Sequence, residues 1–149
     1  MSKSSIDPLL VKETYRFNLP IQVKYSDLDA YMHVNNAVYL NYLEHARALY
    51  LREVCDWDIN TTGAVLGNVN INFIKAIHVG DHPTAYVKCI RLGQKSFTLD
   101  HILMEERDGK QIIYAQCQAT LVSVDMESMK STPIPEVYRS KMITFDGVK

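Results

Sequence analysis

The sequence is poor in the residue types that mark secreted, membrane-bound or low-complexity chains. Its 149 residues include 3 cysteines without a C-x-x-C pair, 6 glycines and 5 prolines, which indicates neither a disulfide framework nor a zinc knuckle nor a disordered chain. No run of about 18 apolar residues occurs, and the N-terminal residues lack the apolar region of a signal peptide. We therefore expect a cytoplasmic protein with buried, reduced cysteines and no membrane anchor.

Charge and short motifs exclude further classes. With 16 Lys and Arg against 17 Asp and Glu, the chain has no excess of positive charge that would attract nucleic acid. The G-x-G-x-x-G, G-x-x-x-x-G-K-[ST] and G-x-S-x-G motifs are missing. His78 and His82 are separated by the helix-breaking Gly80-Asp81, and Asp27-Leu28-Asp29 lacks the later ligands of a calcium loop. We expect no metal site and no nucleic-acid partner.

Alternating apolar residues predict a mainly antiparallel sheet. Period-two patterns predict one strand over residues 15–25 and, after a turn-like stretch over residues 56–67, four more over residues 69–73, 85–90, 97–103 and 113–121. Turn-forming pairs fall between the last four strands, at Gly80-Asp81, Gly93-Gln94 and Asp108-Gly109. Three such hairpin-like connections favour a largely antiparallel arrangement.

One long helix stands out between the first strand and the rest. Apolar residues at spacings of three and four predict this helix from Asn36 to about Cys55, and Pro135 suits the start of a short terminal helix ending near Ile143. Met1 to Lys12 is expected to be a loosely ordered lead-in. The apolar faces of the strands and of the long helix are most simply buried when the sheet wraps around the helix. This predicts one α+β domain over residues 1–149.

A polar cluster lies directly ahead of the predicted long helix. Asp27, Asp29, His33, Asn35 and Asn36 fall within ten residues. The first turn of a helix presents free N–H groups and a positive dipole, which can polarise a carbonyl, and a carboxylate just upstream can serve as base or nucleophile. From spacing alone a structural role is the simpler interpretation, in which an asparagine caps the helix and Asp29 complements its dipole.

The stretch from Val23 to Arg47 resembles a family signature, Y-x-D-x-D-x-x-G-H-V-N-N-x-x-Y-x-x-Y-x-E-x-A-R. This is the signature of the 4-hydroxybenzoyl-CoA thioesterase-like branch of hotdog-fold acyl-CoA thioesterases. The residues Gly93-Gln94-Lys95-Ser96-Phe97 before a strand, Asp108-Gly109 in a hairpin and Pro133-Ile134-Pro135 near the end also look like this family. The resemblance spans roughly residues 15–140.

The resemblance implies an α+β hotdog fold, with a five- to six-stranded antiparallel sheet wrapped around one long central helix. It also implies homodimers with active sites at the subunit interface, often paired into homotetramers. The catalytic carboxylate of the family falls on Asp29 and the carbonyl-polarising backbone N–H on Asn36, while His33 and Asn35 shape the site. The leaving thiol has a pKa near about 8.5, so no strong acid is essential, and no cofactor is expected beyond the coenzyme A of the substrate.

Two features depart from the signature or are unusual. Met32 stands where the family usually has Gly, so a backbone that needs positive φ there would require a differently built loop. Together with Tyr31, it is expected to narrow or cap the acyl pocket. The residues Asn68, Asn70 and Asn72 place a polar ladder on one strand, which fits a solvated sheet face or, alternatively, an interface or substrate contact.

The expected ligand is an acyl-CoA. Lys88, Arg91, Lys95 and Ser96 lie in a basic stretch that can meet coenzyme A phosphates, although a solvated strand face explains them equally well. The sequence therefore predicts an acyl-CoA thioesterase that releases a carboxylic acid and coenzyme A. The alternatives are a thioesterase acting on acyl-carrier-protein and a non-catalytic hotdog protein that binds acyl thioesters.

Overall fold

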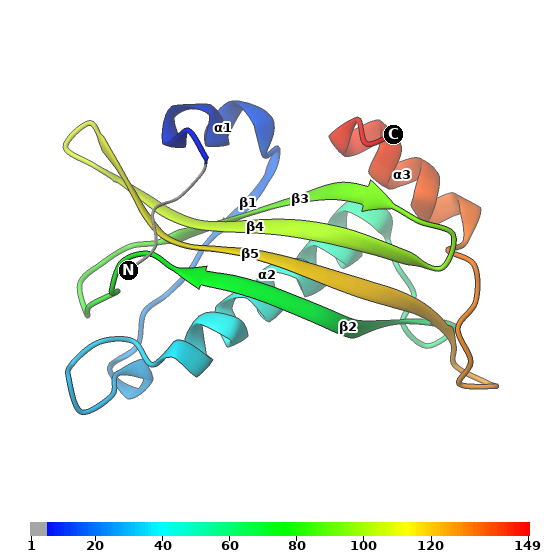
Figure 1. Ribbon diagram of the computed structural model, residues 1–149, viewed down its shortest axis with the longest axis horizontal. Coiled ribbons are helices and arrows are strands. Elements are labelled where there is room, and N and C mark those ends of the chain that lie inside the picture. Colours follow the sequence, from blue (N-terminus) through cyan, green and yellow to red (C-terminus); the bar gives the residue numbers. More distant parts are fainter. Residues whose placement is uncertain (1–5) are drawn as a thin grey trace.

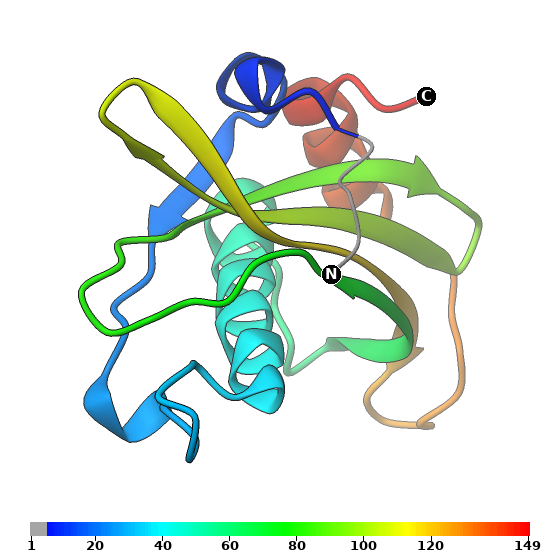
Figure 2. The same ribbon diagram turned by 60° about the vertical axis from the view of Figure 1, so that its left-hand side comes forward.

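A curved five-stranded sheet wraps around a long helix in the computed structural model, which describes residues 6–149 (Figures 1 and 2). The helix α2 (Asn36–Cys55) runs diagonally behind the sheet, where the apolar spacing predicted it. Neighbouring strands are all antiparallel, which confirms the predicted α+β arrangement. The strands, in the order β1-β3-β4-β5-β2, are β1 (Phe17–Pro20), β3 (Thr84–Leu92), β4 (Ser96–Arg107), β5 (Lys110–Asp125) and β2 (Thr62–Phe73).

Two of the three predicted hairpins are present, and the third is wrong. The β3–β4 and β4–β5 connections lie at Gly93-Gln94 and Asp108-Gly109, and φ values of 54° at Asp108 and 74° at Gly109 fit a tight hairpin turn. By contrast, β2 and β3 are separated by β4 and β5 in the sheet. The Gly80-Asp81 turn still reverses the chain, but β2 pairs along its length with the longer β5, so this connection crosses the sheet.

Several element boundaries also differ from the prediction. The first strand ends at Pro20, and the chain enters a 3₁₀ helix, η2 (Tyr25–Asp27), where residues 15–25 were expected to continue as a strand. Pro20 lies on the edge strand, as a residue without an N–H donor must. The predicted turn-like stretch is wrong from Thr62 onward, because β2 begins there and continues through a bulge between Leu66 and Asn68.

The N-terminal segment is more ordered than expected. Pro8–Leu10 forms a 3₁₀ helix, η1, and Val11–Thr14 forms a short helix, α1. Val11 is fully buried in a small apolar cluster on the outer face of the sheet, which it shares with Tyr15, Tyr86, Ile102, Met104 and Ile113. The expectation of a loose lead-in is therefore wrong for Pro8 to Lys12, while Met1–Ser5 lies outside the described residues.

The main core lies between α2 and the inner face of the sheet. Tyr39, Leu43, Ala46 and Tyr50 of α2 are buried against inward-facing residues of β3, β4 and β5, and the three cysteines are buried free thiols, as predicted. The terminal helix α3 (Glu136–Asp146) packs against α2 and β3 and runs one turn beyond the predicted end. This packing fixes α2 along its length, so its first turn has a defined position.

The asparagine ladder lies on an exposed part of the sheet. Asn68, Asn70 and Asn72 are exposed and stand opposite Thr120, Gln118 and Gln116 of β5 in the antiparallel register. Amide and hydroxyl side chains thus share this face in the single chain, which fits a solvated face and equally a face that contacts a second subunit or a substrate.

Candidate active site

The loop ahead of α2 is folded around Asp29. Leu28 and Val34 form an isolated antiparallel bridge, and the backbone closes between Asp29 N and His33 O at 2.8 Å. The amides of Tyr31 and His33 donate to Asp29 Oδ1 at 2.9 and 3.4 Å. Oδ2 has no hydrogen-bond partner among residues 6–149, so one carboxylate oxygen of this half-buried residue is available to a ligand.

Met32, which stands where the family signature has glycine, adopts a left-handed backbone conformation. Its φ is 63°, in the left-handed region, and its amide donates to Asp29 O at 3.0 Å. The expectation of a differently built loop is therefore wrong, because Met32 accepts the strained conformation in place of glycine. Met32 is 50% exposed and Tyr31 is 81% exposed in the single chain.

The first turn of α2 leaves an amide free beside this loop. Asn35 is the N-cap, and its Oδ1 accepts a hydrogen bond from Ala37 N at 2.8 Å. Asn36 is the first helical residue, and its amide has no acceptor within residues 6–149. At the positive end of a 20-residue helix, such an N–H can donate to a carbonyl oxygen as negative charge develops on it.

Asp27 has a different environment from Asp29, although only two residues separate them. Its Oδ2 accepts hydrogen bonds from the hydroxyl of Tyr42 at 2.6 Å and from the amide of Lys24 at 2.9 Å. Burial, together with the adjacent Asp27 carboxylate, raises the pKa of Tyr42, which therefore stays a proton donor. Asp27 O also accepts from Asn35 N at 3.0 Å. Asp27 thus fastens the loop to α2.

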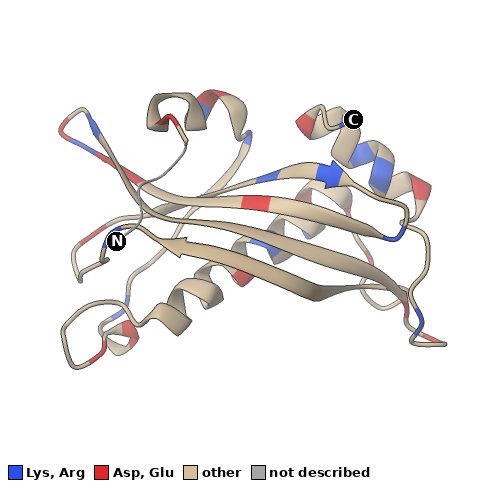
Figure 3. Ribbon diagram, viewed as in Figure 1, with Lys and Arg blue, Asp and Glu red and all other residues tan. Residues whose placement is uncertain are grey.

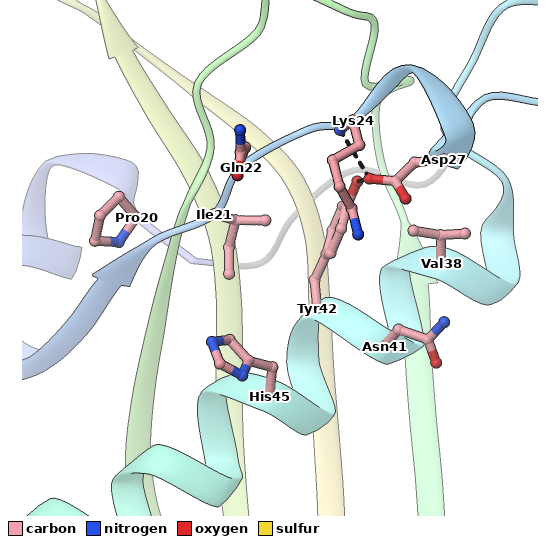
Figure 4. A pocket seen from close by; sticks show the side chains of 9 residues that line it. All are labelled: Pro20, Ile21, Gln22, Lys24, Asp27, Val38, Asn41, Tyr42 and His45. Carbon is pink, nitrogen blue, oxygen red and sulfur yellow. Dashed lines mark hydrogen bonds between the residues drawn. The ribbon is translucent and has the colours of Figure 1, made fainter.

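A cavity of about 410 Å³ opens between α2 and the segment that follows β1 (Figure 4). Figure 4 shows Asp27 and Tyr42 joined at one side of it, with Asn41 and His45 on the adjoining helix face. Sequence analysis missed Tyr42 as a partner of this loop, because its position in the apolar stripe of α2 indicated only a core residue. The signature tyrosine in that position was the available signal.

His33 is held by a loop that is distant in sequence. Its ring meets that of His78 edge-to-face, with centroids 4.7 Å apart, and the neighbouring Val34 donates its amide to Ile77 O at 2.8 Å. Asp81 accepts from the amide of His78 at 2.8 Å and so fixes the turn that carries it. Within residues 6–149 no three potential ligands converge on a metal position. These contacts pack the His33 side chain against the turn that carries His78, beside the aspartate loop.

The residues assigned to coenzyme A lie far from Asp29 within one chain. Arg91 donates to the hydroxyls of Thr98 and Ser96 at 3.1 and 3.0 Å, on the outer face of the sheet. The connection that leads into β3 contacts the loop, since Val34 N donates to Ile77 O, and the start of β3 lies beside the segment after β1, since Ile21 N donates to Pro83 O. At about 3.3 Å per residue, Arg91 is roughly 26 Å beyond Pro83 along the strand. Figure 3 shows basic residues near this far end of β3. The structure does not bring Lys88, Arg91, Lys95 and Ser96 together with Asp29.

The wrapped sheet, the central helix and the aspartate loop define a hotdog fold of the thioesterase type. A family model of the thioesterase-like superfamily matches residues 23–142. The chain therefore belongs to the thioesterase-like superfamily. No helix of the described residues is long and apolar enough to cross a membrane.

Individual relatives agree with this membership. The long-chain acyl-CoA thioesterase FadM of Escherichia coli (strain K12) is 30% identical over 125 residues, which cover 82% of this chain and 93% of FadM. A thioesterase from Thermus thermophilus, solved with coenzyme A and Zn, is 28% identical with a TM-score of 0.77 over 92% of this chain and 99% of that chain. A mutant 4-hydroxybenzoyl-CoA thioesterase solved with 4-hydroxybenzoyl-CoA shares the fold, with a TM-score of 0.77 at 15% identity over 84% and 96% of the two chains.

Proposed function

We propose that this protein hydrolyses acyl-CoA thioesters, with Asp29 as the catalytic carboxylate and the Asn36 amide as the group that polarises the carbonyl. The proposal rests on two groups in and next to the loop. Oδ2 of Asp29 has no hydrogen-bond partner within residues 6–149, and the Asn36 amide at the start of α2 has no acceptor there. Membership of the thioesterase-like superfamily and the likeness to FadM support the same reaction.

The reaction follows from the chemistry of a thioester. The Asn36 N–H and the helix dipole stabilise negative charge on the carbonyl oxygen. Ionised Asp29 either removes a proton from the attacking water or attacks the carbonyl carbon itself, to form an anhydride that water then opens. In both routes the C–S bond breaks and coenzyme A leaves as a thiolate, which is stable enough near neutral pH to need no strong acid. We therefore propose that no resident cofactor takes part.

The test is release of free thiol from a panel of acyl-CoA esters by the parent protein and by Asp29→Asn. Asn retains an oxygen for the Tyr31 and His33 amides, so the loop should stay folded while the negative charge is lost. We expect turnover to fall by about 100-fold or more. The matched control is Asp108→Asn, the same change in the distant β4–β5 hairpin, which should leave turnover intact.

Each failure of this test has a distinct meaning. Unchanged turnover in Asp29→Asn would refute the assigned carboxylate. Absence of turnover on every acyl-CoA by the parent, with turnover of acyl-carrier-protein thioesters, would change the substrate carrier. Saturable binding without any turnover would indicate a non-catalytic acyl-thioester-binding protein. FadM is named for long-chain acyl-CoA, so we propose long aliphatic chains as the first substrates to examine, beside short and aromatic ones.

We also propose that the protein acts as a homo-oligomer in the cytoplasm. The twelve-residue β2 lies at the sheet edge and pairs only with β5 within the described chain, and Val65 and Leu66 on it are about half exposed. A long edge strand with exposed apolar residues favours pairing with another strand, most simply that of a second copy. Free cysteine thiols suit a reducing compartment. Sedimentation should show a dimer or tetramer, and a monomer at micromolar concentration would contradict the proposal.

A further inference from the structure

The connection between β2 and β3, residues 74–83, is held beside the aspartate loop by contacts from two other elements. The hydroxyl of Tyr39 on α2 donates to Lys75 O at 2.9 Å and accepts from Ile77 N at 3.1 Å. Val34 of the aspartate loop donates its amide to Ile77 O at 2.8 Å, and the Ile77 side chain is fully buried. The next residue along the chain therefore has a fixed backbone position.

That next residue is His78, and the turn that carries it is also held from β4. Asp81 Oδ2 accepts from the His78 amide at 2.8 Å, and Asp81 Oδ1 accepts from Arg107 Nη2 at 2.7 Å. Burial alone would raise the pKa of Asp81, but the His78 amide and the Arg107 guanidinium outweigh burial and lower that pKa, so Asp81 is ionised at neutral pH. The His78 ring lies close to this carboxylate, with Nδ1 3.7 Å from Asp81 Oδ2. Groups outside the aspartate loop thus set the position of the ring.

The ring of His78 in turn contacts the residue whose backbone closes on Asp29. Its centroid is 4.7 Å from that of His33, and the ring planes meet at 88°, the edge-to-face arrangement that aromatic rings favour. The His33 backbone is bonded to Asp29 twice, since Asp29 N donates to His33 O at 2.8 Å and His33 N donates to Asp29 Oδ1 at 3.4 Å. One residue therefore links His78 to the proposed catalytic carboxylate.

We propose that His78 is a positioning residue for Asp29. Its ring holds His33 in place, and the His33 backbone then holds the Asp29 carboxylate in the orientation that attack on a thioester requires. The inference deepens the proposed function and rests on it. The contribution of His78 is the contact made by its ring, so neither its charge nor a proton from it takes part. Because catalysis depends steeply on the alignment of the reacting groups, a small displacement of Asp29 should lower the rate of the chemical step.

The test compares His78→Ala with His78→Phe by thiol release from an acyl-CoA that the parent turns over. We expect His78→Ala to lower kcat by about 10-fold, since a displaced catalytic group loses rate steeply. His78→Phe keeps an aromatic ring and should retain kcat within about 2-fold. KM should change by less than about 2-fold in both, because misalignment of Asp29 acts on the transition state and removes no ground-state contact. The matched control is His82→Ala, in the same connection, because the exposed His82 ring contacts no other ring among residues 6–149. This control should behave as the parent.

Amide hydrogen exchange measures the same positioning without a thioester. The amides of Tyr31 and His33 donate to Asp29 Oδ1, so they should exchange at least about 5-fold faster in His78→Ala and at the parent rate in His78→Phe. The Asn35 amide is bonded at the other end of the loop and should exchange as in the parent. This comparison separates a displaced Asp29 from an unfolded loop.

Three results would overturn the inference. The first is a His78→Ala protein with the kcat and the exchange rates of the parent. The second is a kcat in His78→Phe as low as in His78→Ala, because the imidazole itself and not the ring contact would then matter. The third is a raised KM with an unchanged kcat, which would make His78 a substrate contact.

The experiment stays decisive if one variant or the proposed reaction fails. His78→Gln, which also lacks a ring, replaces His78→Ala if that protein does not fold; 53% of the His78 side chain is exposed, so either change removes little of the core. A parent without turnover on any thioester would refute the proposed hydrolysis, while the exchange rates, which need no turnover, test the contact between His78 and the aspartate loop separately.

Discussion

His101 is predicted to make the stability of the fold depend on pH. It is fully buried on β4 beneath α2, and its Nδ1 lies 3.1 Å from Cys117 O. Burial, and to a smaller extent the positive charge of Arg47, lowers the pKa of His101 from 6.5 to about 4. The folded protein therefore keeps this histidine neutral at pH values where the unfolded chain protonates it.

The sign and size of the effect follow from this difference. Between pH 6.5 and about 4 the unfolded state holds the extra proton, so the free energy of unfolding falls as the pH falls through that range. At about 1.4 kcal/mol per pKa unit, the loss is about 3 kcal/mol. Below the lower value both states are protonated and the contribution becomes constant.

Urea denaturation of the parent and of His101→Gln at several pH values between 7.5 and 4 measures this contribution. Gln cannot take up a proton, so the difference in unfolding free energy between the two proteins should shift by about 2–3 kcal/mol in favour of the variant at the acidic end. Carboxylates titrate in both proteins and cancel in the comparison. His45→Gln, on an exposed position of α2, is the matched control. Parallel stability curves for the parent and His101→Gln would refute the reasoning.

Three further substitutions test the loop and the sheet. Tyr42→Phe should cost about 1.5–3 kcal/mol of stability in urea, since it removes the hydrogen bond to buried Asp27; an unchanged midpoint would contradict the anchoring role. Met32→Gly should raise the stability by up to about 1 kcal/mol, because its φ of 63° suits glycine, and a loss in thermal or urea unfolding would count against strain. Burial raises the pKa of Asp100 despite the hydroxyl of Tyr15 that donates to it, so the folded state binds protons more tightly and loses stability as the pH rises above 3.8. Asp100→Asn should therefore stabilise the protein at pH 7 and less so at pH 3, and an equal effect at both pH values would refute this.

The sequence patterns predicted α2 well because its signals are local. Asn35 caps the helix, the apolar residues repeat every three or four positions, and Asp56 ends it in a left-handed conformation with φ of 52°. The partner of each strand is not local information. Alternation in β2 indicates which side chains share a face, but not that β5 is its neighbour in the sheet, so the turn signal at Gly80 suggested a hairpin with β3. Similarly, Gly67 favoured a turn in a stretch where pairing with β5 produces a strand with a bulge.

The candidate site was predictable as a set of residues and not as a set of contacts. The signature selected Asp29, Asn36 and His33, and the structure gathers these residues in the loop and first turn. The contact between His33 and His78 joins segments 45 positions apart, which no spacing rule connects. The basic residues near Arg91 were grouped by composition alone, and the strand direction carries them away from the loop.

The two aspartates of the loop explain why the residue spacing matters. Asp27, with the Tyr42 hydroxyl and the Lys24 amide on one oxygen, fixes the loop to α2. That fixed point lets Asp29 use one oxygen to close its own turn and keep the other without a protein partner. A carboxylate held in this way has little freedom to lose when a thioester arrives, which is the condition for efficient catalysis by a single charged group. In the proposed mechanism the two roles are therefore divided, with Asp27 as the anchor of the loop and Asp29 as the catalyst.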